Sequence, residues 1–380
     1  MQGEILRISM VLFGIDFSVI ELVLFGALFF CLLILLLYYS LIYLRLALYK
    51  NKKQKEKQEK EPVSVVVYAK NQAYLLKDKL FSLLEQEYPN YEVIVVNHAS
   101  QDETSFILKV FTETYKHLKI VDIQEDVNIF QGRKYPLSIG IKCAKNDIII
   151  LTDAESVPAS YQWISEMEKR FVKGIDIVLG YVGRELGDGF SQYTYAAESA
   201  SYLGAALMKS PYMGIGKNLA YRRSFFFEKG GFIKHYAISP GDDVLFVNKN
   251  STSKNTAMVI NENSFVTAKS FPLFDDLVRY RRNKIKLYFH FKAKDKFLRI
   301  QYPLMNILYY ALFIALLVIG FPYEILVGTL VLKFGWHIFT FYKYSKRFKQ
   351  KKIFIFAPLF ELFFLIFDTF LAIPAFIKRT

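Results

Sequence analysis

Apolar residues are concentrated in long uninterrupted runs near both ends of the chain. Leu22 to Leu44 is a run of 23 residues without a charge, and Ile300 to Tyr323 is a second run of 24. Each could cross about 30 Å of hydrocarbon as a helix. A third run, Ile325 to Tyr342, is interrupted only by Lys333. These runs predict a membrane anchor near the N-terminus and a transmembrane hairpin near the C-terminus.

The last apolar segment, Ile353 to Ile377, carries two acids and two prolines and is harder to assign. Glu361 and Asp368 are seven residues apart and lie on one helix face, while Pro358 and Pro374 would bend the helix. Each carboxylate costs about 2 to 3 kcal/mol at mid-bilayer. The segment is either a third crossing, with its acidic face turned into the bundle or into water, or an interfacial or re-entrant helix.

Between these runs, short apolar segments alternate with segments of helical spacing. This alternation is typical of βαβ units and a mostly parallel sheet, in which ligands bind beyond the carboxyl ends of the strands. The expected strands are 63–67, 91–96, 118–123 and 147–151, and the expected helices are 74–84, 104–115 and 135–144. The loops to inspect are therefore 68–72, 97–102 and 152–158. Ser100 with Glu103 fits a capping box at the start of the second helix.

The apolar composition excludes a simple soluble protein, and the distribution of basic residues predicts how the chain is oriented in the membrane. Hydrophobic residues make up 53% of the 380, and the formal net charge is +14. Arg45 to Glu61 holds seven basic residues, and Lys343 to Lys352 holds six with no acid. By the positive-inside rule these segments, and the globular domain between them, lie in the cytoplasm, with the N-terminus outside. The two cysteines, Cys31 and Cys143, cannot make a disulfide framework, which favours a reducing compartment.

Two further segments combine aromatic residues with a bias in charge. Arg279 to Arg299 has nine basic residues and one acid among its aromatics. Single-stranded nucleic acid is one possible ligand, but the segment runs into the predicted hairpin, so an amphipathic helix on an anionic bilayer surface is favoured. No nucleic-acid partner is expected. Phe190 to Met213, with four tyrosines, is a candidate interfacial lip for the acceptor of a reaction.

Paired acids follow two of the predicted elements. Asp153 and Glu155 stand at the end of a strand, where both could reach one divalent cation that also bridges a diphosphate; an ordinary acidic turn is the alternative. Asp242 and Asp243 follow Gly241 before an apolar segment. They are either favourable acids at a helix N-terminus or include a base that deprotonates a hydroxyl nucleophile.

Together, over roughly residues 62 to 290, these motifs resemble family 2 glycosyltransferases of the GT-A fold, in the membrane-anchored branch found in bacteria. The segments that carry the resemblance are Val63–Asn71, Ser82–Val96, Ile149–Glu155 with its DxD-like acids, Gly216–Ser224 through Phe232, and Gly241–Asp243. The resemblance implies a nucleotide-diphosphate sugar donor held by Mg²⁺ or Mn²⁺, and an acceptor hydroxyl that attacks the anomeric carbon with inversion.

The resemblance also implies roles for individual residues. Asp153 and Glu155 would face the metal and the diphosphate, and Asp243 would be the general base, with Asp242 as the fallback. The other positions carried over are Ala69, Asn71, Asn97, Arg133, Lys134 and Asp153 for donor binding and Gly216, Lys217 and Asn218 for the acceptor side.

Several positions depart from the family pattern. Asn97-His98 stands where an Asp pair is usual, Asn71-Gln72 replaces the usual Asn-Glu, and the DxD is a DxE. The stretch Tyr280 to Lys284 does not match the Gln-x-x-Arg-Trp motif of processive synthases, so polymerisation is not expected. These departures leave a second hypothesis open, in which the protein is a catalytically degenerate membrane scaffold that binds a partner.

The sequence thus predicts an α/β GT-A domain with a mostly parallel mixed sheet and transmembrane helices at both ends. The expected parts are an anchor (1–46), a basic linker (47–61), the glycosyltransferase domain (62–277), an interfacial helix (278–299), a helical hairpin (300–344), and a basic loop with a C-terminal helix (345–380). We expect an integral protein of the bacterial inner membrane with its catalytic domain in the cytosol. Its partners would be a UDP- or GDP-sugar, a lipid-linked or other membrane-associated glycan acceptor, and membrane lipids.

Overall fold

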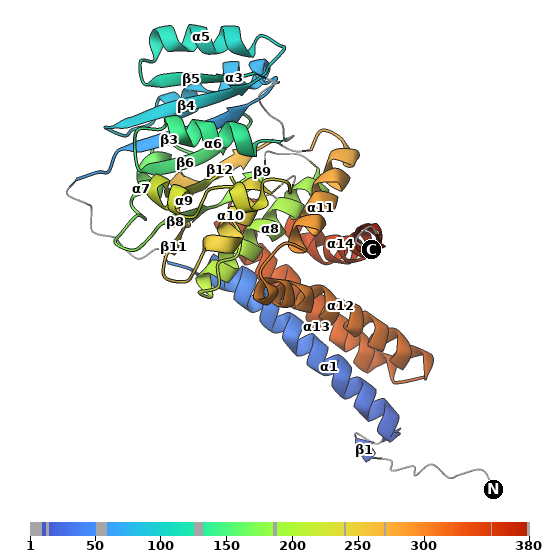
Figure 1. The fold of residues 1–380 in the computed structure, drawn as a ribbon. Coiled ribbons are helices and arrows are strands. Elements are labelled where there is room, and N and C mark those ends of the chain that lie inside the picture. Colours follow the sequence, from blue (N-terminus) through green and yellow to red (C-terminus); the bar gives the residue numbers. More distant parts are fainter. Residues whose placement is uncertain are drawn as a thin grey trace. The chain divides into compact units, whose positions relative to one another are not determined.

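The chain forms two compact units, Leu48–Lys292 and a second made from both ends, Met1–Ala47 with Ala293–Thr380. Figure 1 shows the elements of each in a computed structural model. The structure describes residues 10–12, 15–50, 59–124, 132–184, 188–238, 241–269, 271–350 and 352–377. Most of the predicted basic linker, 51–58, lies outside the described residues.

The unit Leu48–Lys292 is built around a seven-stranded sheet with the order β11-β8-β10-β6-β3-β4-β5. The strands are β3 (Val63–Ala69), β4 (Tyr91–His98), β5 (Leu118–Ile123), β6 (Ile148–Asp153), β8 (Ile177–Gly180), β10 (Leu219–Arg222) and β11 (Thr256–Val259). β3 runs parallel to β4 and β6, β4 to β5, and β8 to β11, whereas β10 is antiparallel to both of its neighbours. The predicted mixed, mostly parallel sheet is confirmed.

Helices and a small second sheet complete this unit. The helices are α3 (Ala73–Lys79), α4 (Phe81–Leu84), α5 (Thr104–Thr114), α6 (Lys134–Cys143), α7 (Trp163–Glu168), α8 (Gly189–Leu207), α9 (Arg223–Glu228), α10 (Asp242–Asn250) and α11 (Phe274–Tyr288), with short 3₁₀ turns at Ile233–His235 and Glu262–Ser264. A three-stranded sheet orders β7 (Val157–Pro158), β12 (Val266–Ala268) and β9 (Val182–Arg184).

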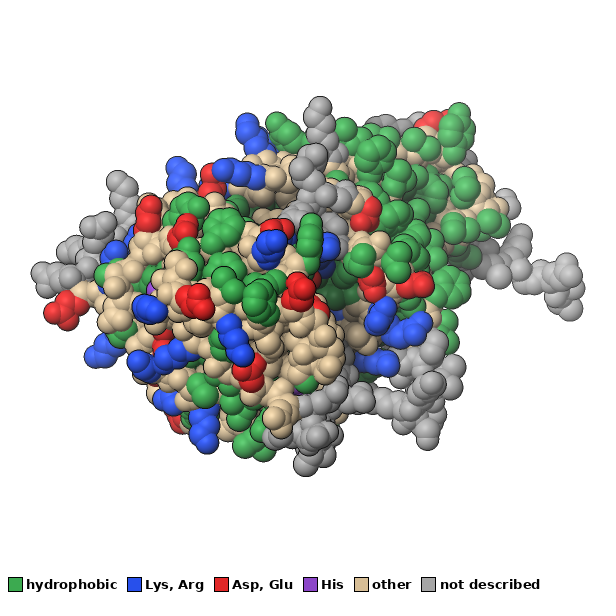
Figure 2. All heavy atoms as spheres, turned by 90° about the horizontal axis from the view of Figure 1, so that it is seen from above, with side chains coloured by type: hydrophobic (Ala, Val, Ile, Leu, Met, Phe, Trp, Pro, Cys, Tyr) green, Lys and Arg blue, Asp and Glu red, His purple; other side chains and the backbone are tan. Residues whose placement is uncertain are grey.

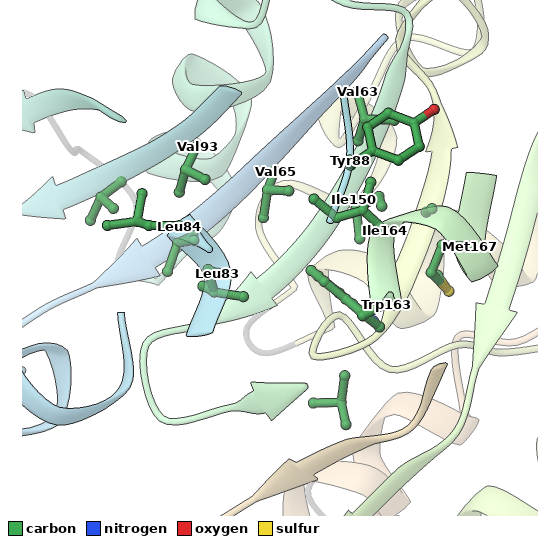
Figure 3. Close-up of a cluster of buried hydrophobic side chains, with 14 of the residues drawn as sticks. Val63, Val65, Leu83, Leu84, Tyr88, Val93, Ile150, Trp163, Ile164 and Met167 are labelled. Atoms are coloured by element: carbon green, nitrogen blue, oxygen red, sulfur yellow. The ribbon is translucent and has the colours of Figure 1, made fainter. Parts of the chain in front are cut away.

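The main sheet is covered on both faces, which explains why its strands are apolar at almost every position. Val63 and Val65 belong to a core with Trp163 of α7 and with leucines of α4, the cluster seen in Figure 3. Val66 points the other way, toward α6. A Cβ on Gly140 of α6 would lie 2.9 Å from the side chain of Val66, so only glycine lets this helix approach the strand so closely.

The predicted strands and helices of this unit form within one or two residues of their expected ends, except that the helix expected over 74–84 is two short helices, α3 and α4. The predicted capping box is wrong. α5 begins at Thr104, and the backbone amide of Thr104 donates a hydrogen bond to Asp102 Oδ1 at 3.0 Å. Ser100 Oγ instead accepts a hydrogen bond from the amide of Asn71 at 2.9 Å. Ser100 is therefore used to join the loops that follow β3 and β4.

Two predictions about the aromatic segments are also wrong. The single helix expected over 278–299 is two helices, because the chain turns between α11 and Ala293: the amide of Lys292 donates to Asn248 Oδ1 at 2.9 Å and Phe291 is buried. The folded domain therefore extends to Lys292. The segment 190–213, expected as an interfacial lip for an acceptor, lies mostly in α8, and the tyrosines of this helix are buried inside the unit rather than exposed at an interface.

The unit formed by both chain ends is a helical bundle. At the N-terminal end, α1 (Val19–Tyr39) continues through a π-helical turn (Ser40–Leu44) into α2 (Arg45–Ala47), and the short strands β1 (Met10–Leu12) and β2 (Ile15–Phe17) pair antiparallel before α1. The C-terminal end supplies α12 (Ala293–Val318), α13 (Tyr323–Arg347), a 3₁₀ turn (Lys352–Phe356) and α14 (Ala357–Ile377). In the described part, Val19–Ala47, Ala293–Val318, Tyr323–Arg347 and Ile353–Ile373 are long and apolar enough to cross a membrane.

Large apolar side chains are exposed along these four helices, which favours membrane association. Figure 2 shows hydrophobic side chains gathered over one region of the face it displays, while acidic and basic side chains are interspersed elsewhere on that face. α14 turns one of its two acids inward. Glu361 Oε2 lies 2.8 Å from Lys333 Nζ of α13, and Tyr39 of α1 donates to Glu361 Oε1 at 2.7 Å.

Candidate functional site

A cavity of about 550 Å³ lies in the unit Leu48–Lys292, where β3 and β6 end. Tyr68 near the end of β3 is paired in register with Asp153, the last residue of β6, and both line the cavity. This is the carboxyl edge at which parallel sheets bind ligands. One part of the wall is charged and is formed by Arg133, Asp153, Glu155, Lys217, Asp242 and Asp243.

Asp153 and Glu155 are held together by one ammonium group. Lys217 Nζ lies 2.8 Å from Asp153 Oδ2 and also contacts Glu155 Oε1. Burial alone would raise the pKa of Asp153, but the charges of Arg133 and Lys217 outweigh it and lower that pKa to about 2. Asp153 is therefore a carboxylate throughout the physiological pH range.

Arg133 connects the two pairs of acids. It precedes α6, and its guanidinium donates to Asp153 Oδ1 at 2.8 Å and to Asp242 Oδ2 at 3.1 Å, with Asp243 Oδ2 at 3.8 Å. Burial opposes the charge of Arg133, but these three carboxylates raise its pKa above the ordinary value. The site therefore holds a permanent cation within reach of an entering anion.

Lys134, the other basic residue predicted to bind the donor, points elsewhere. Its ammonium donates to the carbonyl oxygen of His235 at 2.9 Å and also to that of Ile238, and the side chain is buried. Among the described residues it is not part of the cavity wall. Lys134 instead holds the backbone that leads into Gly241 and the two acids that follow.

Asp242 and Asp243 form the first turn of α10 and both line the cavity. Asp243 is 4% exposed, and its Oδ1 has no hydrogen-bond partner among the described residues. Burial, and then the negative charge of Asp242, raise the pKa of Asp243 to about 7. A carboxyl group with a free oxygen and a pKa near neutrality is suited to take a proton from a substrate.

The segment Gly216–Asn218 lies against both pairs of acids. A Cβ on Gly216 would be 1.8 Å from Asp243 Oδ2, so glycine is needed for the carboxylate to pack against the backbone. Asn218 is fully buried, and its side chain bonds with the Trp163 indole at 3.0 Å and the Tyr181 carbonyl at 2.8 Å. Asn218 therefore has a structural place, whereas Gly216 and Lys217 line the cavity.

Three predicted donor-binding residues lie near the sheet edge but are not, in the described part of the chain, among the residues that line the cavity. Ala69 is fully buried, and Asn71 Oδ1 accepts from the amide of Gln101 at 2.8 Å. Asn97 donates to Asp122 Oδ1 at 2.7 Å, while its own amide oxygen is buried and has no hydrogen-bond partner among the residues that the structure describes. Tyr68 and Gln72 face the cavity instead.

An aromatic end of the cavity was missed from the sequence. The Arg184 guanidinium lies 3.6 Å from the ring centroid of Tyr195 and 4.3 Å from that of Phe271. Nearby, Tyr280 donates to Glu198 at 2.5 Å. Arg184 stands in no motif, and Tyr280 drew attention only as part of an aromatic segment and of a family motif that fails, so the sequence assigned neither to the cavity.

Comparison with known proteins agrees with this geometry. Residues 64–228 match the family model of glycosyl transferase family 2. Over these residues the chain is similar to that family. Among curated relatives, the chain is 30% identical over 128 residues to a poly-β-1,6-N-acetyl-D-glucosamine synthase of Staphylococcus epidermidis. The aligned region is 33% of this chain and 29% of the relative. The chain is also 33% identical over 98 residues to a probable glycosyltransferase of Bacillus subtilis, and this alignment covers 25% of this chain and 23% of the relative.

The match therefore spans less than a third of these relatives' own length. A solved mannosyltransferase of Pyrobaculum calidifontis, in complex with GDP-Man and Mn²⁺, aligns over 90% of this chain and 98% of its own, with a TM-score of 0.56 and 20% identity. At this identity the likeness concerns the fold, and the predicted GT-A architecture of the glycosyltransferase is confirmed.

Proposed function

We propose that the protein is an inverting glycosyltransferase of the hexosyl type that moves a sugar from a UDP- or GDP-sugar to a membrane-associated acceptor, such as a lipid-linked or cell-envelope glycan. The observation that carries this proposal is Asp243. Its free carboxylate oxygen lies in the same cavity as the cations Arg133 and Lys217, so a base and an anion-binding group share one space.

In this proposal Asp243 takes the proton of the acceptor hydroxyl as the hydroxyl oxygen bonds to the anomeric carbon. The bond from that carbon to the diphosphate breaks on the opposite face, and the nucleoside diphosphate leaves with the electron pair. Arg133 and Lys217 lower the cost of the negative charge that develops on the leaving group. Asp242 raises the basicity of Asp243 through its charge.

A divalent cation, Mg²⁺ or Mn²⁺, fits the chemistry of the remaining acids. Asp153 and Glu155 offer carboxylate oxygens, the hard ligands that these ions prefer, and leave other ligand positions for water and phosphate. They are two ligands only, since the described residues contain no group of three or more acids, histidines or cysteines placed to hold a metal. When bound, the cation would supply further positive charge to the diphosphate.

The membrane part of the proposal is supported by charge and by helix length. Basic residues flank the apolar helices on the side that leads to the glycosyltransferase domain, as expected for a domain on the cytosolic face of a bacterial inner membrane. An enzyme attached in this way meets acceptors that are themselves held in the bilayer.

Asp243→Asn tests the proposed base. The substitution keeps the size of the side chain but removes the proton acceptor, so we expect sugar transfer to fall by at least about 10²-fold while nucleotide affinity changes less than about threefold. Transfer from radiolabelled UDP- and GDP-sugars to bacterial membrane lipids would be measured beside calorimetric binding of UDP and GDP. Asp78→Asn, at an exposed position of α3, is the matched control.

Activity of Asp243→Asn within about tenfold of the wild type would remove Asp243 as the base. A folded wild-type protein that binds neither UDP nor GDP, with or without Mn²⁺, would instead support the scaffold hypothesis.

A further inference from the structure

The pair of carboxylates suited to a divalent ion is already bridged by a side chain of the protein. Lys217 Nζ is 2.8 Å from Asp153 Oδ2 and contacts Glu155 Oε1 as well. The other oxygen of Asp153 accepts from Arg133 at 2.8 Å. The ammonium therefore contacts one oxygen of each of the two acids that would hold a divalent ion.

The backbone of Lys217 is anchored in this position. Thr152, the residue before Asp153 in β6, donates through Oγ1 to the carbonyl oxygen of Lys217 at 3.0 Å. The next residue, Asn218, is fully buried, and its amide bonds to Trp163 Nε1 and to the carbonyls of Tyr181 and Ser264. The Cα of Lys217 is thus fixed beside the end of β6, and only its four-carbon side chain is free to swing.

The ammonium of Lys217 forms salt bridges with both acids, at 2.8 Å from Asp153 Oδ2 and in contact with Glu155 Oε1. A monovalent cation bonded to both carboxylates and a divalent ion on the same oxygens would repel each other strongly at such short range. The two cations therefore exclude each other at this pair of acids.

We propose that Lys217 is a built-in counter-cation of Asp153 and Glu155, which competes with divalent metal ions for this pair and contacts the donor diphosphate when it leaves the acids. The proposal deepens the proposed function and rests on it for the identity of the diphosphate. Released from the acids, the ammonium needs only a side-chain rotation to meet an anion in the cavity that it already lines.

Mn²⁺ binding to the full-length protein in detergent, followed by the electron paramagnetic resonance of free Mn²⁺ and without any nucleotide, tests the competition. Lys217→Met and Lys217→Gln should bind Mn²⁺ at least about tenfold more tightly than the wild type, since both remove the competing charge. Lys217→Arg should stay close to the wild type. Lys169→Met is the matched control, because it removes another lysine–glutamate ion pair. Lys169 Nζ lies 2.9 Å from Glu166 Oε1 of α7.

Thermal unfolding of each variant shows whether it is folded, and Lys217→Gln, which keeps a hydrogen-bond donor near the acids, disturbs the site least. Mn²⁺ affinity of a folded Lys217→Gln or Lys217→Met variant within about twofold of the wild type would overturn the competition.

Binding of UDP and GDP in the presence of chelator tests the second half of the proposal. The wild type should keep measurable affinity without metal, and Lys217→Met should lose at least about tenfold of it, with Mn²⁺ restoring the loss. Equal chelator-resistant affinity in both proteins would overturn the contact with the diphosphate. If neither nucleotide binds any variant under any condition, the proposed function and this diphosphate contact fail, whereas the Mn²⁺ measurement still decides whether Lys217 competes with metal.

Discussion

At the scale of single residues, the chemistry of Asp243 is produced by its surroundings rather than by its own side chain. The carboxyl group is buried at the start of α10, beside Asp242 and within 3.8 Å of Arg133. Burial and the neighbouring acid raise its pKa to about 7. Below this pH the group is protonated and cannot act as a base, and above it the group is a carboxylate that can.

The rate of sugar transfer should therefore rise with pH through about 7 and level off above pH 8. Asp242→Asn should move this rise to lower pH by about one unit, because it removes a negative charge that raises the pKa of Asp243. Values of kcat/KM between pH 5.5 and 9 for both proteins check this. A rise that stays at the same pH in Asp242→Asn would contradict the assignment of Asp243 as the titrating group.

Gly216→Ala should damage both activity and stability. The new Cβ would meet Asp243 Oδ2 at 1.8 Å, so the carboxylate or the backbone must shift. We expect transfer to fall by at least about 10²-fold, since small displacements in an active site are costly, and stability to fall by about 1 to 3 kcal/mol, as for other overpacked sites. Transfer assays and thermal unfolding measure the two effects.

Gly335→Ala is the control for this substitution, because a Cβ on Gly335 in α13 meets nothing within 4 Å. Wild-type activity in Gly216→Ala would show that the base tolerates movement, and would contradict the tight packing described for it.

At the scale of elements, α14 is attached to the bundle by a buried ion pair. Glu361 and the ammonium of Lys333 in α13 are 2.8 Å apart, with side chains 3% and 0% exposed. Hydroxyl groups of Tyr39 in α1 and Tyr302 in α12 also donate to Glu361. One carboxylate thus contacts side chains from three other helices, which is why this acid is tolerated in an apolar segment.

Glu361→Gln should destabilise the bundle by about 3 to 5 kcal/mol, because it leaves the charge of Lys333 buried without its partner. Thermal unfolding in detergent measures the loss. Glu324→Gln, at an exposed position in the first turn of α13, is the control and should change little. An unfolding temperature of Glu361→Gln equal to that of the control would mean that the pair does not hold α14.

At the scale of the whole molecule, the chain separates into a unit that contains the entire candidate site and a unit that contains the apolar helices. The main sheet, its core and every residue named in the cavity wall belong to Leu48–Lys292. The two ends of the chain form the bundle between them. The candidate site and the apolar helices are therefore encoded in different parts of the chain.

A fragment of residues 59–292 should therefore fold and bind UDP or GDP within about threefold of the full chain, because its core and cavity are complete. It should lose transfer to acceptors embedded in liposomes, since it lacks the apolar helices. Cooperative thermal unfolding, calorimetry and liposome transfer assays check these outcomes. Liposome transfer by the fragment equal to that of the full chain would contradict a role of the helices in reaching the acceptor.

The sequence by itself determined the order of strands and helices from residue 63 to residue 151, the apolar segments and the acidic motifs, because each depends on neighbours a few residues away. β5 forms over the residues expected, and β6 continues two residues past the expected end at Leu151, to Asp153. Asp242 and Asp243, for which the sequence left open a helix N-terminus or a base, do lie in the first turn of α10. Local pattern was sufficient because hydrogen bonding and burial in these elements follow short-range rules.

Only the tertiary structure decided which charges meet. Lys217 reaches Asp153 across 64 residues of sequence, and Arg133 reaches Asp242 across 109. Lys134, next to Arg133, turns to backbone carbonyls instead because adjacent helical positions face different directions. Such pairings depend on how the sheet and its helices pack, and no local pattern specifies them, so the counter-cation at the acidic pair became visible only in the folded chain.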